Sequence, residues 1–211
     1  MQNKENQVRL RPGNSKMGKV FHVNLPPCKT CDHTLPCYSS EECYALKAWR
    51  QYPGTRKAWM HNWDLFQKSP DQYFKSIADQ IKRKKSLDMF RWHSAGDLVN
   101  YKYLCNMYAM AHEFPDIKFM AFTKKYKVLA DEVNWRAPFW KAPNMTLVIS
   151  AWPGLKIPVL LRRKFPIAWM EDSGNPDKRI PHSAVECSGQ CDECMLCWRL
   201  TKGQSVFFHK H

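Results

Sequence analysis

The chain alternates between short apolar runs and longer amphipathic stretches, a pattern that predicts strands separated by helices. The run 145–150, Met-Thr-Leu-Val-Ile-Ser, is apolar almost throughout, as expected of a strand that is buried on both faces. The first predicted strand, 19–25, alternates and is ended by two prolines. Four further short runs are also predicted to be strands: 87–92, 117–122, 167–170 and 206–209.

Helical spacing dominates between these runs. Aromatic residues recur at helical intervals over 56–84, and the sequence Ser69-Pro70-Asp71 interrupts that stretch. Ser69 is the predicted N-cap of its second half, because proline is favoured at the first helical position. Further helices are predicted over 44–50, 101–113 and 128–135.

Strands that alternate with helices indicate an α/β fold with a parallel sheet. We expect either an incomplete, partial TIM-like barrel or an open parallel sheet, with cysteine-rich metal loops near both ends of the chain. Both architectures bind ligands beyond the carboxyl ends of the strands. The side chains expected to converge on that rim are Arg91, His93, Ser94, Asp97, Thr123, Lys124, Ser150 and Trp152.

Size and composition favour one globular domain. The chain has 211 residues and a 44% apolar content, so it can bury a substantial core. We expect an extended tail over 1–18 and a single α/β domain over 19–211. No apolar run approaches the roughly 18 residues of a membrane span, and the N-terminus has no apolar stretch typical of a secretory signal. These features predict a cytoplasmic protein without a membrane partner.

The charge balance points to anionic partners. Thirty-three Lys and Arg face nineteen Asp and Glu, which gives a formal charge of +14. Such a surplus is typical of proteins that meet nucleic acids, nucleotides or other phosphorylated ligands. The basic residues form the clusters 82–85, 124–127 and 162–164, each of which is alternatively the solvated end of a helix or strand.

Eight of the nine cysteines fall into two groups, and Cys105 stands alone. In a chain without an export signal, clustered cysteines favour metal ligation over disulfides. The C-terminal group has the spacing C-x3-C-x2-C-x2-C, which is tighter than a zinc ribbon and resembles a ferredoxin-like run. Its members are Cys187, Cys191, Cys194 and Cys197.

The N-terminal group is spaced more loosely and lies directly after the first predicted strand. Its members are Cys28, Cys31, Cys37 and Cys43. The loose spacing is compatible with either zinc or an iron–sulfur cluster. Three protein ligands would leave one metal position open to a substrate or cofactor, whereas four would close the site.

The segment Arg91-Trp92-His93-Ser94-Ala95-Gly96-Asp97 follows the second predicted strand. Gly96 would permit close approach of a ligand, and Asp97 would bind its amino group. The alternative is structural, with Asp97 as a helix N-cap and His93 hydrogen-bonded in the core. Lys124 would meet a carboxylate or phosphate, or would be a solvated lysine. The common phosphate-binding, dinucleotide-binding, zinc-protease and serine-hydrolase motifs are absent from the sequence.

Several short motifs together resemble the gene product 88 family of phage proteins, from residue 14 onward. They are Asn14-Ser15-Lys16-Met17, Cys43-Tyr44-Ala45, Arg91-Trp92-His93 with Gly96-Asp97, Phe122-Thr123-Lys124, Ser150-Ala151-Trp152 and Cys197-Trp198. The resemblance implies a small cysteine-rich phage protein that works in the cytoplasm of the bacterial host. The family has no settled biochemical activity.

The Cys-Tyr-Ala element is similar to one in phage proteins regarded as distant relatives of radical S-adenosylmethionine enzymes. In those enzymes a Gly-Gly-Glu-like element binds the methionine amino group. Ser94-Ala95-Gly96-Asp97 is similar in position, with Ala for the first Gly and Asp for Glu. The resemblance therefore implies S-adenosylmethionine as a candidate cofactor.

Two classes of function remain open at this stage. The first is an iron–sulfur protein with one or two clusters, of the 4Fe-4S type, and radical S-adenosylmethionine-like activity on a nucleotide or nucleic-acid-related substrate. There Gly96 and Asp97 would hold the cofactor, and Arg91, His93 and Lys124 would face the substrate. The second is a non-catalytic basic module, stapled by zinc or iron–sulfur sites, that binds nucleic acid or a host or phage protein.

Overall fold

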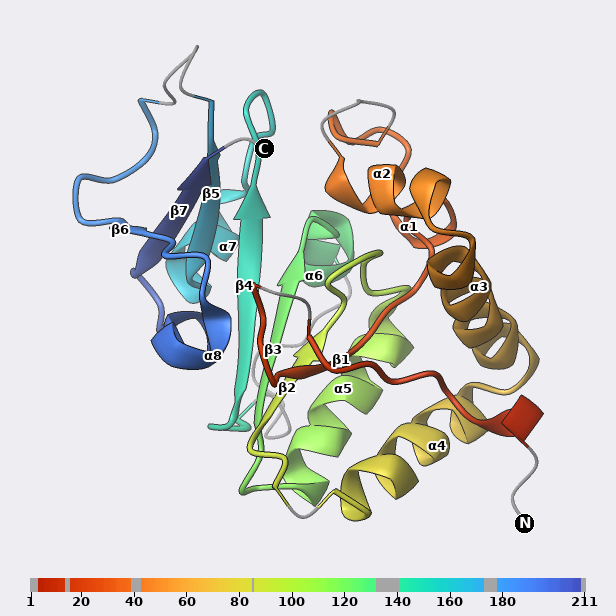
Figure 1. The fold of residues 1–211 in the computed structure, drawn as a ribbon. Coiled ribbons are helices and arrows are strands. Elements are labelled where there is room, and N and C mark those ends of the chain that lie inside the picture. The colour runs from red at the N-terminus through yellow and green to blue at the C-terminus, as the bar shows by residue number, and fades with distance from the viewer. Residues whose placement is uncertain are drawn as a thin grey trace.

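The structure is a computed structural model that describes residues 4–13, 16–38, 43–84, 86–131, 141–172 and 178–209. Its strands form one sheet in which each strand is parallel to its neighbours, in the order β1-β2-β3-β4-β5-β7-β6 (Figure 1). The sheet is open, with β1 and β6 at its two edges. The strands are β1 (Phe21–Val23), β2 (Met89–Trp92), β3 (Lys118–Thr123), β4 (Met145–Ala151), β5 (Ile167–Glu171), β6 (Val185–Glu186) and β7 (Ser205–His209).

Helices lie between most successive strands, as expected for parallel pairing, although no described helix lies between β5 and β6. They are α1 (Pro27–Thr30), α2 (Tyr44–Gln51), α3 (Pro53–Lys68), α4 (Pro70–Lys82), α5 (Tyr101–Glu113), α6 (Tyr126–Asp131), α7 (Val159–Lys164) and α8 (Cys191–Cys194). Two short 3-10 helices are η1 (Lys4–Asn6) and η3 (Leu196–Trp198). The side chain of Ser69 accepts a hydrogen bond from the amide of Gln72, which confirms the predicted N-cap of α4.

The two faces of the sheet are covered differently, because alternate residues of a strand point to opposite sides. On one face, Phe90, Trp92 and Leu147 pack with residues of α3, α4 and α5 in the main core. On the other face, Met120 and Val148 belong to a smaller core that also contains Trp198. We call this second side the open face, and Figure 1 shows α8 near it, apart from α2, α3, α4 and α5.

The N-terminal residues are held along the helices that cover the main core. The amide of Val8 donates to Ser76 Oγ at 2.8 Å, and the amide of Arg9 donates to Asn62 Oδ1 at 2.7 Å. Arg11 then forms an antiparallel bridge with His22 at the start of the sheet. The predicted extended tail thus contains η1 and a docked segment, while Asn14 and Ser15 lie outside the described residues.

The predicted fold class is confirmed as an open parallel α/β sheet. Helix α5 has the predicted bounds, and β4 is buried along its whole length. Sequence reasoning missed the short elements α1, α7, α8 and β6. The predicted helix 128–135 begins earlier, at Tyr126, and residues 132–135 of that prediction lie outside the described part. Among the described residues, the helices are all too short or too polar to cross a membrane.

Candidate functional site

The four C-terminal cysteines line one small pocket on the open face, with a free volume of about 20 Å³. Cys191 and Cys194 occupy the ends of α8, and Cys187 precedes it. Met195 has a left-handed backbone, with φ of 52°. That conformation ends α8 and redirects the chain into η3, so Cys197 lines the same pocket as the others.

Backbone hydrogen bonds fasten this segment, residues 187–200, at both sides of the sheet. The amide of Cys187 donates to the carbonyl of Phe207 in β7, and the amide of Cys191 donates to the carbonyl of Lys16, just before β1, each at 2.8 Å. In the middle, Thr146 Oγ1 donates to the Trp198 carbonyl at 2.9 Å. We call residues 187–200 the C-terminal strap, because they cross the open face from β7 to the residues before β1.

Two thiols of the strap are affected by burial and by the charge of Arg91. Burial raises the pKa of Cys197 to about 12 and also raises the pKa of Cys191, while the positive charge of Arg91 lowers both. Buried thiols ionise most readily when a metal cation stabilises the thiolate. As the side chains stand, no group of three or more His, Cys, Asp or Glu among the described residues is arranged to hold a metal ion. The donor set and the shared pocket fit a metal–thiolate centre, although the thiols are not arranged as ligands.

The N-terminal cysteines gather at the carboxyl edge of the sheet. Cys31 directly follows α1, and Cys43 is the N-cap residue of α2. Burial raises the pKa of both Cys31 and Cys37, and each is raised further by the neighbouring Cys43. Cys31, Cys37 and Cys43 thus lie within electrostatic range of one another, and we call them the N-terminal cysteine group, although their described side chains are not arranged as metal ligands. The backbone of Cys28 lies in α1, but its side chain is outside the described part.

Asp97 lies beside this group and braces three segments. Its Oδ1 accepts hydrogen bonds from the Leu98 amide at 2.7 Å and the Thr123 hydroxyl at 2.7 Å. Its Oδ2 accepts from the Lys124 amide at 2.9 Å. Burial raises the pKa of Asp97, and the hydrogen bonds from Lys124 and Thr123 oppose that rise. The carboxylate thus joins the loop after β2 to the end of β3, and most of its acceptor positions are occupied.

The alternative role of Asp97 as a helix cap is wrong. Asn100 is the N-cap of α5, and its side chain accepts a hydrogen bond from the Tyr103 amide at 2.9 Å. Asp97 comes three residues earlier, in the loop, where its own amide donates to Thr30 Oγ1 at 3.0 Å. It is a link between α1 and β3 rather than a cap.

Gly96 is packed against the end of the first strand. Its φ is +81°, and a Cβ at this position would lie 2.6 Å from the Leu25 carbonyl oxygen and 2.7 Å from Thr30 Oγ1. Glycine is required here because the loop approaches this backbone so closely. That approach is to the protein's own backbone, and cofactor binding by Gly96 and Asp97 stays a prediction.

His93 is buried and strained. It is 3% exposed and has a left-handed φ of 56°, which few non-glycine residues adopt. Its ring lies 5.4 Å from the Tyr103 ring, between centroids, and neither ring nitrogen has a hydrogen-bond partner among the described residues. The expectation of a hydrogen-bonded core histidine is therefore wrong about the hydrogen bond. Burial, followed by the charge of Arg91, lowers the pKa of His93 to about 3, so the ring is neutral.

Lys124 lies on the predicted rim, whereas the prediction for Arg91 is wrong because this residue lies inside the sheet. Arg91 lies within β2 and contacts two residues on the open face: Nη1 is 3.4 Å from Met17 Sδ, and the guanidinium is 5.1 Å from the Phe122 ring centroid. Lys124 follows β3 and holds its ammonium 5.2 Å from the centroid of the Trp152 ring. Lys124 also lowers the pKa of Cys31 and Cys37 against the larger effect of burial, which places it near the N-terminal cysteine group.

Two rim residues were missed by sequence reasoning. Asn24 directly follows β1, and its Oδ1 accepts hydrogen bonds from the Ser94 amide, the Ser94 hydroxyl and the Ala95 amide. Tyr44 donates from its hydroxyl to the Ser94 carbonyl. Asn24 lies inside the predicted strand 19–25, so the sequence contained no signal for this role; only the shorter observed β1 leaves it at the strand end. The sequence contained no signal for the contact of Tyr44 either.

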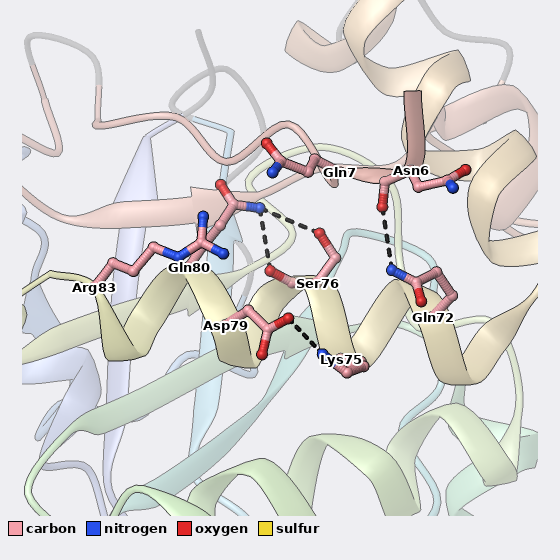
Figure 2. A pocket seen from close by; sticks show the side chains of 8 residues that line it. All are labelled: Asn6, Gln7, Gln72, Lys75, Ser76, Asp79, Gln80 and Arg83. Atoms are coloured by element: carbon pink, nitrogen blue, oxygen red, sulfur yellow. Dashed lines mark hydrogen bonds and ion pairs between the residues drawn. The ribbon is translucent and has the colours of Figure 1, made fainter. Parts of the chain in front are cut away.

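A further pocket lies away from both cysteine groups. It has a free volume of about 220 Å³ and lies between the N-terminal segment and α4 (Figure 2). Its polar side chains are largely engaged with one another, for example Lys75 Nζ with Asp79 Oδ2 at 2.7 Å and Gln72 Nε2 with the Asn6 carbonyl at 3.4 Å. The cysteine groups carry more chemistry than this pocket, and we place the candidate site there.

A comparison with protein families shows which family this chain belongs to. The gene product 88 family matches residues 2–153, well over half of the chain. The chain belongs to the gene product 88 family of phage proteins. The match includes the N-terminal cysteines and the segment from Arg91 to Asp97, whereas the C-terminal cysteines lie beyond it. No curated protein and no solved structure matches the chain.

Proposed function

We propose that this gene product 88 protein is a metal–thiolate protein that binds iron–sulfur clusters through its two cysteine groups. The observation that carries the proposal is the shared pocket of Cys187, Cys191, Cys194 and Cys197 on the open face. Four thiols are the donor set of iron–sulfur clusters and of structural zinc. The four described cysteines of the strap and the three of the N-terminal group are free thiols, in keeping with work in the reducing cytoplasm of a bacterial host.

The two groups are proposed to have different roles. The strap is fastened by its own backbone on both sides of the sheet, which suits a closed site that stabilises the fold. The N-terminal group lies at the carboxyl edge, where α/β proteins bind their ligands. When bound there with an open coordination position, an iron–sulfur cluster would supply one-electron chemistry, including that of radical S-adenosylmethionine enzymes.

The chain's own residues suggest which ligand would approach that edge. Lys124 places a positive charge beside Cys31 and Cys37 and close to the Trp152 ring. A cation next to an aromatic ring suits a phosphate-bearing planar ligand, and the +14 charge of the chain favours polyanions generally. A nucleotide or nucleic-acid-related substrate is therefore part of the proposal.

The test is elemental analysis of anaerobically purified protein, with its visible spectrum. We expect iron and acid-labile sulfide in similar amounts and a brown colour. Cys31→Ser and Cys194→Ser should each lower the iron content, whereas Cys105→Ser, in α5 and outside both groups, serves as the matched control and should leave it unchanged. Protein without metal, or equal metal content in all three variants, would overturn the proposal.

A second candidate is a zinc-stapled, non-catalytic binding module. It is favoured by Asp97, whose carboxylate accepts three hydrogen bonds from the protein itself, and by Gly96, which packs against Leu25 and Thr30. Two zinc ions without sulfide would establish this candidate instead. Consumption of S-adenosylmethionine by the reduced protein, measured by chromatography, would exclude it.

A further inference from the structure

Arg91 places a permanent positive charge under the C-terminal strap. A guanidinium does not lose its proton in proteins, so this charge persists at every accessible pH. The side chain projects from β2 and is partly buried. Its Nε is fully buried and has no hydrogen-bond acceptor among the described residues.

The immediate contacts of Arg91 do not neutralise it. The Met17 thioether is a weak acceptor, and the Phe122 ring offers only its π-face. Within the described ranges, no carboxylate lies within 4.0 Å of the guanidinium nitrogens. A charge removed from water without a counter-ion is costly, so an anion is expected next to this side chain.

The same two contacts locate that anion. Met17 is a buried member of the small open-face core, and Phe122 packs against it together with Cys191 and Cys197. Arg91 therefore lies among the residues on which the cysteine pocket is built. Four thiolates around a divalent ion or a 4Fe-4S cluster would carry a net charge of about −2.

We propose that Arg91 is the partly buried counter-cation of the metal–thiolate centre in the C-terminal strap, and that its charge favours metal retention and reduction of that centre. The inference rests on the proposed function. Arg91 acts through the cysteines and is not itself a ligand. An adjacent positive charge stabilises the more negative, reduced state of a cluster and thereby raises its reduction potential.

The experiment compares Arg91→Met, which removes the charge at similar length, with Arg91→Lys, which keeps it. In Arg91→Met, we expect the reduction potential to fall and the rate of metal loss to a chelator to rise by about tenfold to a hundredfold. Arg91→Lys should restore most of both properties. If the metal is zinc, chelator competition alone provides the readout.

The matched control is Arg199→Met. Arg199 is an exposed arginine on the same strap, and its Nη2 donates to the Cys194 carbonyl at 2.9 Å. Because solvent screens its charge, it should affect the potential and the metal loss much less. Equal effects of Arg91→Met and Arg199→Met would overturn the inference, as would failure of Arg91→Lys to restore a folded, metallated protein. Wild-type protein without metal in the strap would instead refute the proposed function, and the inference with it.

Discussion

The two cysteine groups are built in opposite ways. The N-terminal group belongs to the part of the chain that matches the gene product 88 family, and it lies at the carboxyl edge among loops joined by side-chain hydrogen bonds. The C-terminal group lies beyond that match, and its strap is fastened across the open face by backbone hydrogen bonds. Near the first group the cation Lys124 lies by the rim, whereas near the second the cation Arg91 lies beneath the thiols.

Under the proposed function, this difference separates a site of chemistry from a site that stabilises the fold. Side-chain braces such as Asp97 and Asn24 hold a loop in position at the carboxyl edge of the sheet. The strap instead covers apolar residues of the sheet that the helices leave bare, including Met120 and Val148. Paired changes, one in each region, test this contrast.

The largest expected effect comes from removing one ligand of each group. In Cys194→Ser, the strap should lose its metal and leave the open face uncovered, giving insoluble or unfolded protein. Cys31→Ser should lower metal content but leave a folded chain, because the main core does not depend on that group. Solubility and thermal unfolding of the two variants provide the measurement. Soluble, fully metallated Cys194→Ser would contradict the contrast.

A methyl group added to one glycine in each region should have unequal effects. Gly96→Ala combines a φ of +81° with contacts of 2.6 and 2.7 Å to Leu25 and Thr30, and should lower the free energy of unfolding by about 3–4 kcal/mol. Gly189 in the strap has a similar φ of +77°, but nothing lies within 4 Å of the added Cβ. Gly189→Ala should therefore cost only about 1–2 kcal/mol. Urea unfolding measures the loss of stability in both variants. Equal losses would show that the loop around Gly96 can shift to accommodate the added methyl group.

One buried histidine in each region should make the protein sensitive to acid. Burial and then Arg91 lower the pKa of His22, next to Arg91 in the sheet, to about 4, and that of His93 at the carboxyl edge to about 3. An unfolded histidine has a pKa of about 6.5, so below that pH the unfolded chain binds protons that the folded chain does not. The free energy of unfolding should therefore fall as pH decreases from 6.5 to 4, by about 1.4 kcal/mol per unit for each histidine.

Substitution divides this acid sensitivity between the two regions. His93→Asn should remove about half of the slope, since asparagine tolerates the left-handed backbone at this position. His22→Asn should remove the other half. His182→Asn, at an exposed position, should leave the slope unchanged. Urea unfolding at pH 7, 6 and 5 gives the slopes, and a wild-type slope of zero would contradict the expectation.

The smallest effect is expected from two partly exposed aspartates. Asp192 Oδ2 in the strap accepts a hydrogen bond from the Lys19 amide at 3.3 Å, whereas Asp32 Oδ1 near the N-terminal group accepts from the Thr34 amide, two residues away, at 2.9 Å. Replacing either by Ala should cost about 0.5–1 kcal/mol. Of the two, only Asp192→Ala should speed hydrogen exchange at the Cys191 amide, because Asp192 supports the nearby hydrogen bond from that amide to Lys16, whereas Asp32 bonds to Thr34 in its own loop. Equal exchange in both variants would refute the role of Asp192.

Strong local patterns explain which parts of the fold the sequence predicts. The apolar run of β4 and the helical periodicity of α5 each extend over enough residues to specify an element. The six residues of α7 and the four of α8 are too few for a period to emerge, so these elements depend on tertiary contacts. The grouping of the cysteines is visible in their spacing. The hydrogen bond that fastens the strap to Lys16 cannot be seen in the sequence, because Cys191 and Lys16 are 175 positions apart.

The roles of individual rim residues were harder to predict. A sequence shows that Asp97 follows a strand but not that Thr123 and Lys124 donate to it from the next strand. Likewise, only the left-handed backbone of His93 turns its ring toward Tyr103, and single-residue torsions of this kind leave no periodic signal. Asparagine or glycine is the usual residue for such a torsion, so a histidine at this position did not indicate a left-handed backbone.

The path of the strap also governs how the molecule is assembled during synthesis. Met89, Met120 and Val148 emerge from the ribosome well before Trp198 and Leu200, their partners in the small core. One apolar face of the nascent sheet therefore stays uncovered until the last cysteines have been translated. Exposed apolar surface on a partly synthesised chain promotes aggregation. Expression at low temperature, which slows aggregation, follows as a way to raise the yield of folded protein.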